Sequence, residues 1–187
     1  MNSIWQGKNV RLRAANKNDG FIFADENGNV NTETQRRYDF IDFPYADKVF
    51  GERIEQYLSG TSYGHDFMFI IENNNNESVG FVIVFDCDHR MGTFKYGLFL
   101  TDNAKGKGYG TEAVKLMLNY YFNELRYNKV NVYIYDYNMP SIAFHEKLGF
   151  TKEGRLRQMA YSEGKYHDII FYGMLKDEFN KLYYKKI

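Results

Sequence analysis

A strand, a glycine loop, a helix and a second strand follow one another within residues 92–135, and this succession restricts the fold more than any other feature of the sequence. Residues 92–100, GTFKYGLFL, are rich in β-forming side chains, and the loop KGKGYGT follows at 105–111. Apolar residues then recur at helical spacing up to Leu125, and 129–135, KVNVYIY, alternate as in a strand. Because a helix that joins two strands carries the chain back across the sheet, the second strand should lie parallel to the first.

The remaining segments predict antiparallel strands and further helices. NVRLRAA (9–15) alternates like a first strand, and 66–72 with 78–86 predict a hairpin whose turn is NNNNE. Residues 157–175 predict a second hairpin around SEGK, followed by a short polar and aromatic tail. We expect a short helix within 16–29 and an amphipathic helix over 48–58. The fold class is therefore α+β, with a mixed, mostly antiparallel sheet of six to seven strands that contains one parallel pair and is flanked by about four helices.

Composition predicts one soluble domain over residues 1–187. The chain is 44% apolar, and its 24 basic and 24 acidic residues cancel, so no overall field favours nucleic acid or a membrane surface. A lone cysteine, Cys87, gives no disulfide framework and no zinc-ligand set. We find neither a signal peptide nor a run of apolar residues long enough to cross a membrane, and we expect a reducing cytoplasm.

The glycine loop is a candidate anion site. Glycines at 106, 108 and 110 let the backbone approach a ligand closely, and the N-terminus of the following helix favours negative charge. A nucleoside triphosphate loop is excluded, since no lysine followed by Ser or Thr closes a run of the required spacing. A dinucleotide-binding loop is disfavoured by the G-x-G-x-G spacing and by its place past the middle of the chain. A turn with solvated lysines stays open as the alternative.

A second motif lies about thirty residues further on. NMPSIAFHEKLGF (138–150) predicts a helix with Asn138 near its cap, Pro140 in its first turn and Gly149 just past its end. Together with the glycine loop it resembles the GNAT superfamily of acyl-CoA N-acyltransferases. The matching residues are Lys105, Gly106, Gly108, Gly110, Asn138, Ser141, Lys147, Gly149 and Phe150. The resemblance extends over about residues 10–178. Within the superfamily, the chain is similar to the branch of ribosomal-protein and polyamine acetyltransferases.

This resemblance implies that acetyl-CoA is the cosubstrate. Its pyrophosphate would bind the backbone of Gly106, Lys107, Gly108, Tyr109, Gly110 and Thr111, with added charge from Lys105 and Lys107. The strand before the loop would splay from its parallel neighbour, and its edge at Leu98, Phe99 and Leu100 would pair with the pantetheine arm. Asn138 would hydrogen-bond that arm, and Ser141 and Lys147 complete the expected cofactor contacts. No metal is expected.

The resemblance also implies direct acetyl transfer to a primary amine, either of a polyamine-like small molecule or of a protein N-terminus. His145 stands where relatives often have a tyrosine acid, and it could protonate the leaving thiolate; the alternative is a hydrogen-bonded core histidine. Lys95 stands where many relatives carry a glutamate base. Asp136, expected to face the cleft, is the substitute base, and a cap or turn residue is its alternative. Since no covalent intermediate is expected, Cys87 need not be a nucleophile.

Several other residues have weaker interpretations. Glu112 should be structural because a carboxylate in a first helical turn interacts favourably with the helix dipole. Trp5 should be a packing anchor, and His167 and Asp168 should be strand residues near the acceptor end. The three tyrosines Tyr135, Tyr137 and Tyr161 could line an aromatic acceptor pocket.

Two other kinds of protein remain open. One is an acyl-CoA-binding sensor or scaffold that has lost turnover, which the absent glutamate favours, and the other is a purely structural domain. The acceptor cannot be read from the sequence, and self-association as a homodimer, common among relatives, is also left open.

Overall fold

The computed structural model describes residues 3–16, 19, 36–37 and 64–184. Apart from Asn16 and Asp19, the helix predicted within 16–29 lies outside these residues, and so does the helix predicted over 48–58. No helix of the described ranges is long and apolar enough to cross a membrane.

Seven strands form one sheet in the order β1-β2-β3-β4-β5-β7-β6. Every neighbouring pair is antiparallel except β4 and β5, which are parallel, so the predicted mixed sheet is confirmed. Both predicted hairpins are present, with Asn76 in the left-handed region of the first turn at φ 61°. The strands are β1 (Val10–Ala14), β2 (Phe67–Asn73), β3 (Ser78–Asp88), β4 (Thr93–Leu100), β5 (Lys129–Tyr135), β6 (Thr151–Ser162) and β7 (Lys165–Leu175).

Three α-helices lie within the described part of the chain, against about four predicted for all of it. The helix after the glycine loop is α3 (Tyr109–Asn119), which continues as a π-helical turn over Tyr120–Glu124. The predicted capped helix is α4 (Met139–Leu148). The polar and aromatic tail, to which no element was assigned from the sequence, forms α5 (Lys176–Tyr183). Glu178 accepts a hydrogen bond from the backbone N–H of Leu175 at 2.8 Å, and this one-sided cap marks the start of the helix.

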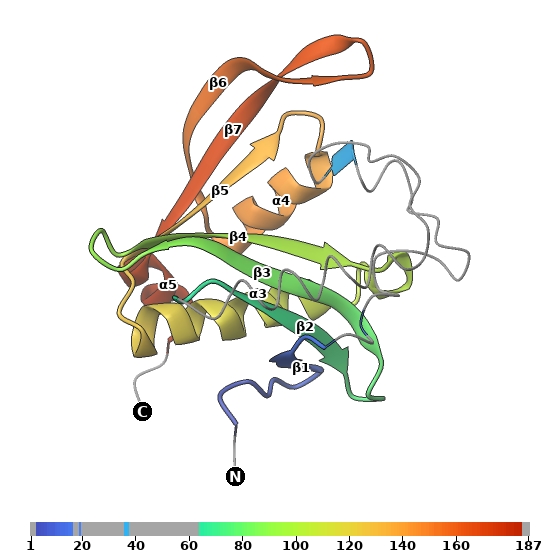
Figure 1. Cartoon of the computed structure of the whole chain (residues 1–187), viewed down its shortest axis with the longest axis vertical. Helices are drawn as coiled ribbons and strands as arrows, with labels where there is room; N and C mark the ends of the chain where they lie inside the picture. Colours follow the sequence, from blue (N-terminus) through green and yellow to red (C-terminus); the bar gives the residue numbers. More distant parts are fainter. Residues whose placement is uncertain (1–2, 17–18, 20–35, 38–63, 185–187) are drawn as a thin grey trace.

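The core lies between the sheet and helices α3 and α4. Even-numbered residues of β4 and β5, such as Phe94 and Val130, are buried on this face, and Phe94 stacks on Tyr121 with ring centroids 4.8 Å apart. Trp5 packs on Phe69 and Tyr120 at 5.0 and 4.5 Å, which confirms it as a packing anchor. In Figure 1, α3 runs along one side of strands β1 to β4, and the β6–β7 hairpin extends beyond the rest of the described chain.

The parallel pair separates soon after it forms. Strands β4 and β5 pair at only three positions, Thr93 with Lys129, Phe94 with Val130 and Lys95 with Asn131. Beyond Lys95, β4 continues to pair with β3 up to Leu100, while β5 continues with β7 up to Tyr135. Figure 1 shows the two strands starting side by side and diverging toward their C-terminal ends. The predicted splay is therefore present, and beyond Lys95 no strand of the described ranges pairs with that edge of β4.

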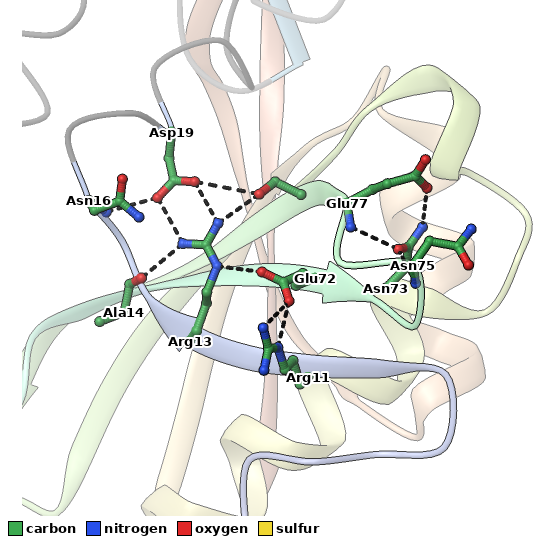
Figure 2. Close-up of polar contacts among 10 residues, drawn as sticks. Arg11, Arg13, Ala14, Asn16, Asp19, Glu72, Asn73, Asn75 and Glu77 are labelled. Carbon is green, nitrogen blue, oxygen red and sulfur yellow. Dashed lines mark hydrogen bonds and ion pairs between the residues drawn. The ribbon is translucent and has the colours of Figure 1, made fainter.

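A fully paired ionic network fixes the far edge of the sheet (Figure 2). Arg13 donates from Nη1 and Nη2 to the carboxylate of Asp19 at 2.9 and 2.7 Å, and from Nε to Glu72 at 2.7 Å. Its two remaining N–H groups bond the carbonyl of Ala14 and the hydroxyl of Ser78. Asp19 and Glu72 are 2% and 5% exposed, and the bonds from Arg13 lower the pKa of both carboxyls against the opposing effect of burial. All five donors of the guanidinium are used.

Candidate active site

A cleft of about 470 Å³ opens where β4 and β5 diverge. It is lined by residues of β3, β4, β5 and α4 and reaches the glycine loop at Lys105 and Gly106. Of the predicted site residues, those that line it are Leu98, Leu100, Lys105, Gly106, Asn138, Ser141 and His145.

The cleft is lined from both faces of the sheet. Tyr96 and Ile134 contribute from the face covered by α4, whereas Lys95 and Tyr135 contribute from the opposite face, since successive side chains of a strand alternate. Parallel pairing of Lys95 with Asn131 puts the odd-numbered residues of both strands on the same face. Two ligands could therefore meet in the gap from opposite faces.

The glycine loop forms an uncapped helix N-terminus at one end of the cleft. Gly108 is the N-cap of α3 with φ 82°, a left-handed conformation that favours glycine, and it supplies no side-chain cap. The N–H groups of the first helical turn have no partners within the helix, so they are available to an anion. Gly110 packs so closely on the ends of Leu98 and Leu100 that a Cβ there would lie 3.0 and 3.1 Å from their methyl groups.

Other predicted cofactor residues are placed less directly. Lys105 pairs with Asp102 at 2.5 Å, and Lys107 is exposed. Phe99 does not line the cleft with its side chain, which stacks on Phe81 at 5.2 Å. Lys147 is exposed on α4 and does not line the cleft either, because helical geometry turns it away from the neighbouring His145.

Asn138 holds the start of α4 at the cleft. Its side chain accepts a hydrogen bond from the N–H of Ser141 at 3.3 Å, as predicted for a cap, and its amide donates to the carbonyl of Arg37 at 3.2 Å. Pro140 lies in the first turn and Gly149 ends the helix with φ 90°. These caps fix the register of α4 and so the direction of His145.

His145 is 6% exposed and hydrogen-bonded at both ring nitrogens. Nδ1 lies 2.7 Å from the carbonyl oxygen of Ser141, so it carries the proton, and Nε2 accepts from the hydroxyl of Tyr96 at 2.8 Å. Burial lowers the pKa of His145 to about 4, although the bond to Ser141 opposes this. The imidazole is therefore neutral at pH 7. The sequence alternation gave no sign that Tyr96 would be its partner.

Asp136 was expected to face the cleft, and this was wrong. Strand β5 ends at Tyr135, whose side chain lines the cleft, and the carboxylate of Asp136 instead bonds Nδ1 of His167 at 3.0 Å. Its other oxygen accepts from the N–H of Asp168 at 3.2 Å. Lys95, which replaces the expected glutamate, does line the cleft and pairs with Asp86 at 2.9 Å.

The remaining predicted residues have clear positions. Glu112 accepts hydrogen bonds from the backbone of Lys8 and Asn9, so it ties α3 to the start of the chain, in keeping with a structural role. Tyr135 stacks on Tyr137 at 5.3 Å, with 10° between the rings. Tyr161 is 66% exposed on β6 and does not line the cleft.

Comparison with known proteins agrees with this architecture. A family model described as an acetyltransferase (GNAT) domain matches residues 9–151. The SPbeta prophage-derived uncharacterized N-acetyltransferase YokL of Bacillus subtilis (strain 168) is 39% identical over 177 residues, 95% of this chain and 96% of the relative. A spermidine N(1)-acetyltransferase of Vibrio cholerae is 22% identical over 160 residues, 86% of this chain and 89% of the relative.

One solved structure illustrates the likeness in fold. The crystal structure of spermidine N-acetyltransferase from Vibrio cholerae in complex with CoA and spermine has a TM-score of 0.78 to this chain. At 20% identity it covers 91% of this chain and 97% of that one. The family model, the splayed parallel pair and the uncapped helix N-terminus together show that this chain belongs to the GNAT family of N-acetyltransferases.

Proposed function

We propose that the protein transfers an acetyl group directly from acetyl-CoA to a primary amine, either of a polyamine-like small molecule or of a protein N-terminus. The observation that carries this proposal is the cleft between β4 and β5, which has an uncapped helix N-terminus at one end and is lined from both faces of the sheet. A cleft of that kind can hold two substrates in line, and much of the rate of such a reaction comes from alignment.

The pyrophosphate of acetyl-CoA is assigned to the backbone from Gly106 to Thr111. Uncapped N–H groups and the dipole of α3 favour an anion there, and Lys105 and Lys107 add positive charge nearby. The pantetheine arm is assigned to the edge of β4 at Leu98 to Leu100, where it would pair as an added strand and pass Asn138 and Ser141. The thioester would then lie near Tyr96 and His145.

His145 is our candidate for the acid that protonates the leaving thiolate. Its resting form is neutral and its Nε2 accepts from the hydroxyl of Tyr96, so the proton that the attacking amine loses as the C–N bond forms would reach Nε2 through that hydroxyl. The same proton would then pass back to sulfur as the C–S bond breaks. Burial keeps the pKa of the imidazole near 4, and an imidazolium of that pKa gives its proton readily to a thiolate, whose conjugate acid has a pKa of about 8.5. Cys87 has no part in this scheme, because burial raises the pKa of its thiol to about 12.

The acceptor is assigned to the face of the sheet opposite α4. Tyr135 and Lys95 line the cleft from that face, and the similarity to spermidine acetyltransferases supports a small-molecule amine. We further propose that residues 1–187 form a single domain that works in the cytoplasm, and that it self-associates as a homodimer.

Release of CoA thiol from acetyl-CoA over a panel of amines and N-terminal peptides tests the proposal. We expect thiol release that depends on both acetyl-CoA and an amine. A catalytically weak sensor or scaffold is the second candidate, which the Lys95–Asp86 pair favours because it puts a paired ammonium where a base would be useful. Tight binding of acetyl-CoA without thiol release on any acceptor would establish the sensor in place of the enzyme.

A further inference from the structure

His167 is a second buried histidine, and it lies on the acceptor face of the sheet. It is 8% exposed, in β7. Tyr135 pairs across the ladder with Ile169, and His167 lies two residues before Ile169, so both side chains project from the face opposite α4. His145 lies on the α4 face, so the two buried histidines lie on opposite sides of the sheet.

One ring nitrogen of His167 has a partner and the other does not. Nδ1 lies 3.0 Å from Oδ1 of Asp136, and because a carboxylate only accepts hydrogen bonds, Nδ1 carries the proton. In a neutral imidazole with its proton on Nδ1, Nε2 is an acceptor, and no described residue donates to this buried atom. Buried polar atoms without partners are rare in folded proteins, which suggests that a ligand supplies the missing donor.

A row of three rings joins this nitrogen to the cleft. Tyr135 lines the cleft, Tyr137 stacks on Tyr135, and the ring of His167 lies edge-on to Tyr137 with centroids 4.6 Å apart. The hydroxyl of Tyr137 donates to the carbonyl of Arg36 at 2.8 Å, which fixes its ring between the other two. An extended acceptor whose reacting amine lies in the cleft could follow this aromatic wall to His167.

The charges around His167 favour a cationic group over a neutral amide. Asp136 is the charge in direct contact with it, and Arg155, which approaches Asp136 at 3.6 Å, is bound more closely by Asp168. Arg157 acts on Asp168 from the exposed side of β6.

We propose that Nε2 of His167 accepts a hydrogen bond from a second amino group of the acceptor, which is therefore a diamine or a longer polyamine. Asp136 is a positioning residue, because it holds the proton on Nδ1 and leaves Nε2 as the acceptor. This inference rests on the proposed function only for where the reacting amine lies.

Matched acceptors test the assignment through kinetics. We expect the wild-type protein to use 1,5-diaminopentane at least about tenfold better than pentylamine in kcat/KM, since only the diamine can reach His167. His167→Phe should raise KM for the diamine by about tenfold to hundredfold with kcat changed by less than about twofold, and leave pentylamine nearly unaffected. Asp136→Asn should also raise KM for the diamine, but by a smaller factor than His167→Phe. His89→Phe, at an exposed histidine between β3 and β4, is the matched control and should change neither.

The proposal would be overturned if His167→Phe lowered kcat/KM equally for both amines or for neither. A decrease in kcat/KM confined to a tripeptide acceptor would overturn it as well. Binding supplies a readout that needs neither turnover nor a variant. Titration of 1,5-diaminopentane should shift the ring-proton NMR signals of His167 in the wild-type protein, and pentylamine should not. If the protein acetylates no amine but the diamine still shifts those signals, the proposed function fails and this inference stands; unchanged signals would refute the inference alone.

Discussion

The ionic network at the edge of the sheet and the His167 pair near the cleft are both buried and both built on carboxylates, yet they differ in one respect. Arg13 uses all five of its donors on Asp19, Glu72, Ala14 and Ser78, as Figure 2 shows for the labelled residues. His167 bonds Asp136 through one nitrogen, and the other has no donor within the described chain. A satisfied network holds the fold together, whereas an unsatisfied acceptor is suited to a ligand.

His145 combines features of both. Both of its ring nitrogens are hydrogen-bonded, just as every N–H group of the Arg13 guanidinium is. Unlike Arg13, however, it lines the cleft, as a functional residue would. Hydrogen bonds at both ring nitrogens are typical of a core residue, and a place in the cleft is typical of an acid. The structure therefore agrees with both interpretations of His145 made from the sequence. Measuring both the free energy of unfolding and the turnover of variants therefore distinguishes residues that hold the fold from residues that act on a ligand.

The largest effect is expected at Arg13. Arg13→Met leaves two buried carboxylates short of their main partner and should lower the free energy of unfolding by about 3 kcal/mol, measured by urea denaturation. The turnover of the protein that remains folded should be unchanged. Arg11→Met is the control, since Arg11 is half exposed and pairs only with Glu72 in this network; it should cost about 1 kcal/mol or less. If the two variants lost equal free energy of unfolding, Arg13 would not be the main stabilising residue of the network.

His145→Phe should lower kcat by about a hundredfold and change the Kd for acetyl-CoA by less than about threefold, because a proton donor acts on the reaction step and not on binding. Steady-state kinetics and calorimetry with acetyl-CoA provide the two values. Loss of stability with an unchanged kcat would make His145 a core residue comparable to Arg13.

The stability of the protein should decrease as pH falls from 7 to 5. The pKa of His145 is lowered from its ordinary value of 6.5 to about 4, so the unfolded chain binds this proton over the range in which the folded protein does not. The free energy of unfolding should fall by about 2 kcal/mol over that interval. Asp19 and Glu72, whose pKa values are also lowered, add a further loss below about pH 5, where the carboxyls of the unfolded chain begin to bind protons.

Thermal unfolding at several pH values provides the check. His145→Phe should remove most of the loss between pH 7 and 5 and leave the part due to His65, whose pKa is also lowered by burial. The loss below about pH 5 should stay in place. A curve of wild-type shape in this variant would mean that another group titrates there.

The smallest effect is expected at the glycine loop. Gly108→Val and Gly164→Val place a side chain at similar positive φ values, 82° and 76°, and in both cases no atom lies within 4 Å of the added Cβ. Both variants should lose about 1–2 kcal/mol of stability through backbone strain. Only Gly108→Val should weaken acetyl-CoA binding, by about tenfold, as calorimetry would show. If both variants, or neither, weakened acetyl-CoA binding, the glycine loop would not be the cofactor site.

Local patterns allowed much of the fold to be predicted. β-Rich runs on either side of a turn located the strands of both hairpins. Asn138, Pro140 and Gly149 marked the limits of α4, because caps and helix ends are encoded locally. Helix α5 was missed because its N-cap is Leu175, which has no capping side chain, and the cap comes only from Glu178 three residues later. The parallel β4–β5 pair followed from the rule for crossover connections.

Side-chain contacts across the sheet were beyond the reach of the sequence. Tyr96 and His145 are 49 residues apart, and Asp136 and His167 are 31 apart, so neither pair leaves a local pattern. Asp136 was expected to face the cleft because it follows β5, but its carboxylate is bound instead by Nδ1 of His167 and the N–H of Asp168. His167 was noted as a strand residue near the acceptor end, and its unpartnered nitrogen became visible only with the tertiary structure.

The most direct test of the account is to identify where the acetyl group goes. The wild-type protein is incubated with acetyl-CoA and a diamine, and the protein and the amine are both analysed by mass spectrometry while CoA thiol is quantified. Direct transfer predicts one acetylated amine for each CoA released and no acetyl group on the protein during turnover. An acetylated protein that forms and decays during turnover, or thiol release without any acetylated amine, would contradict it.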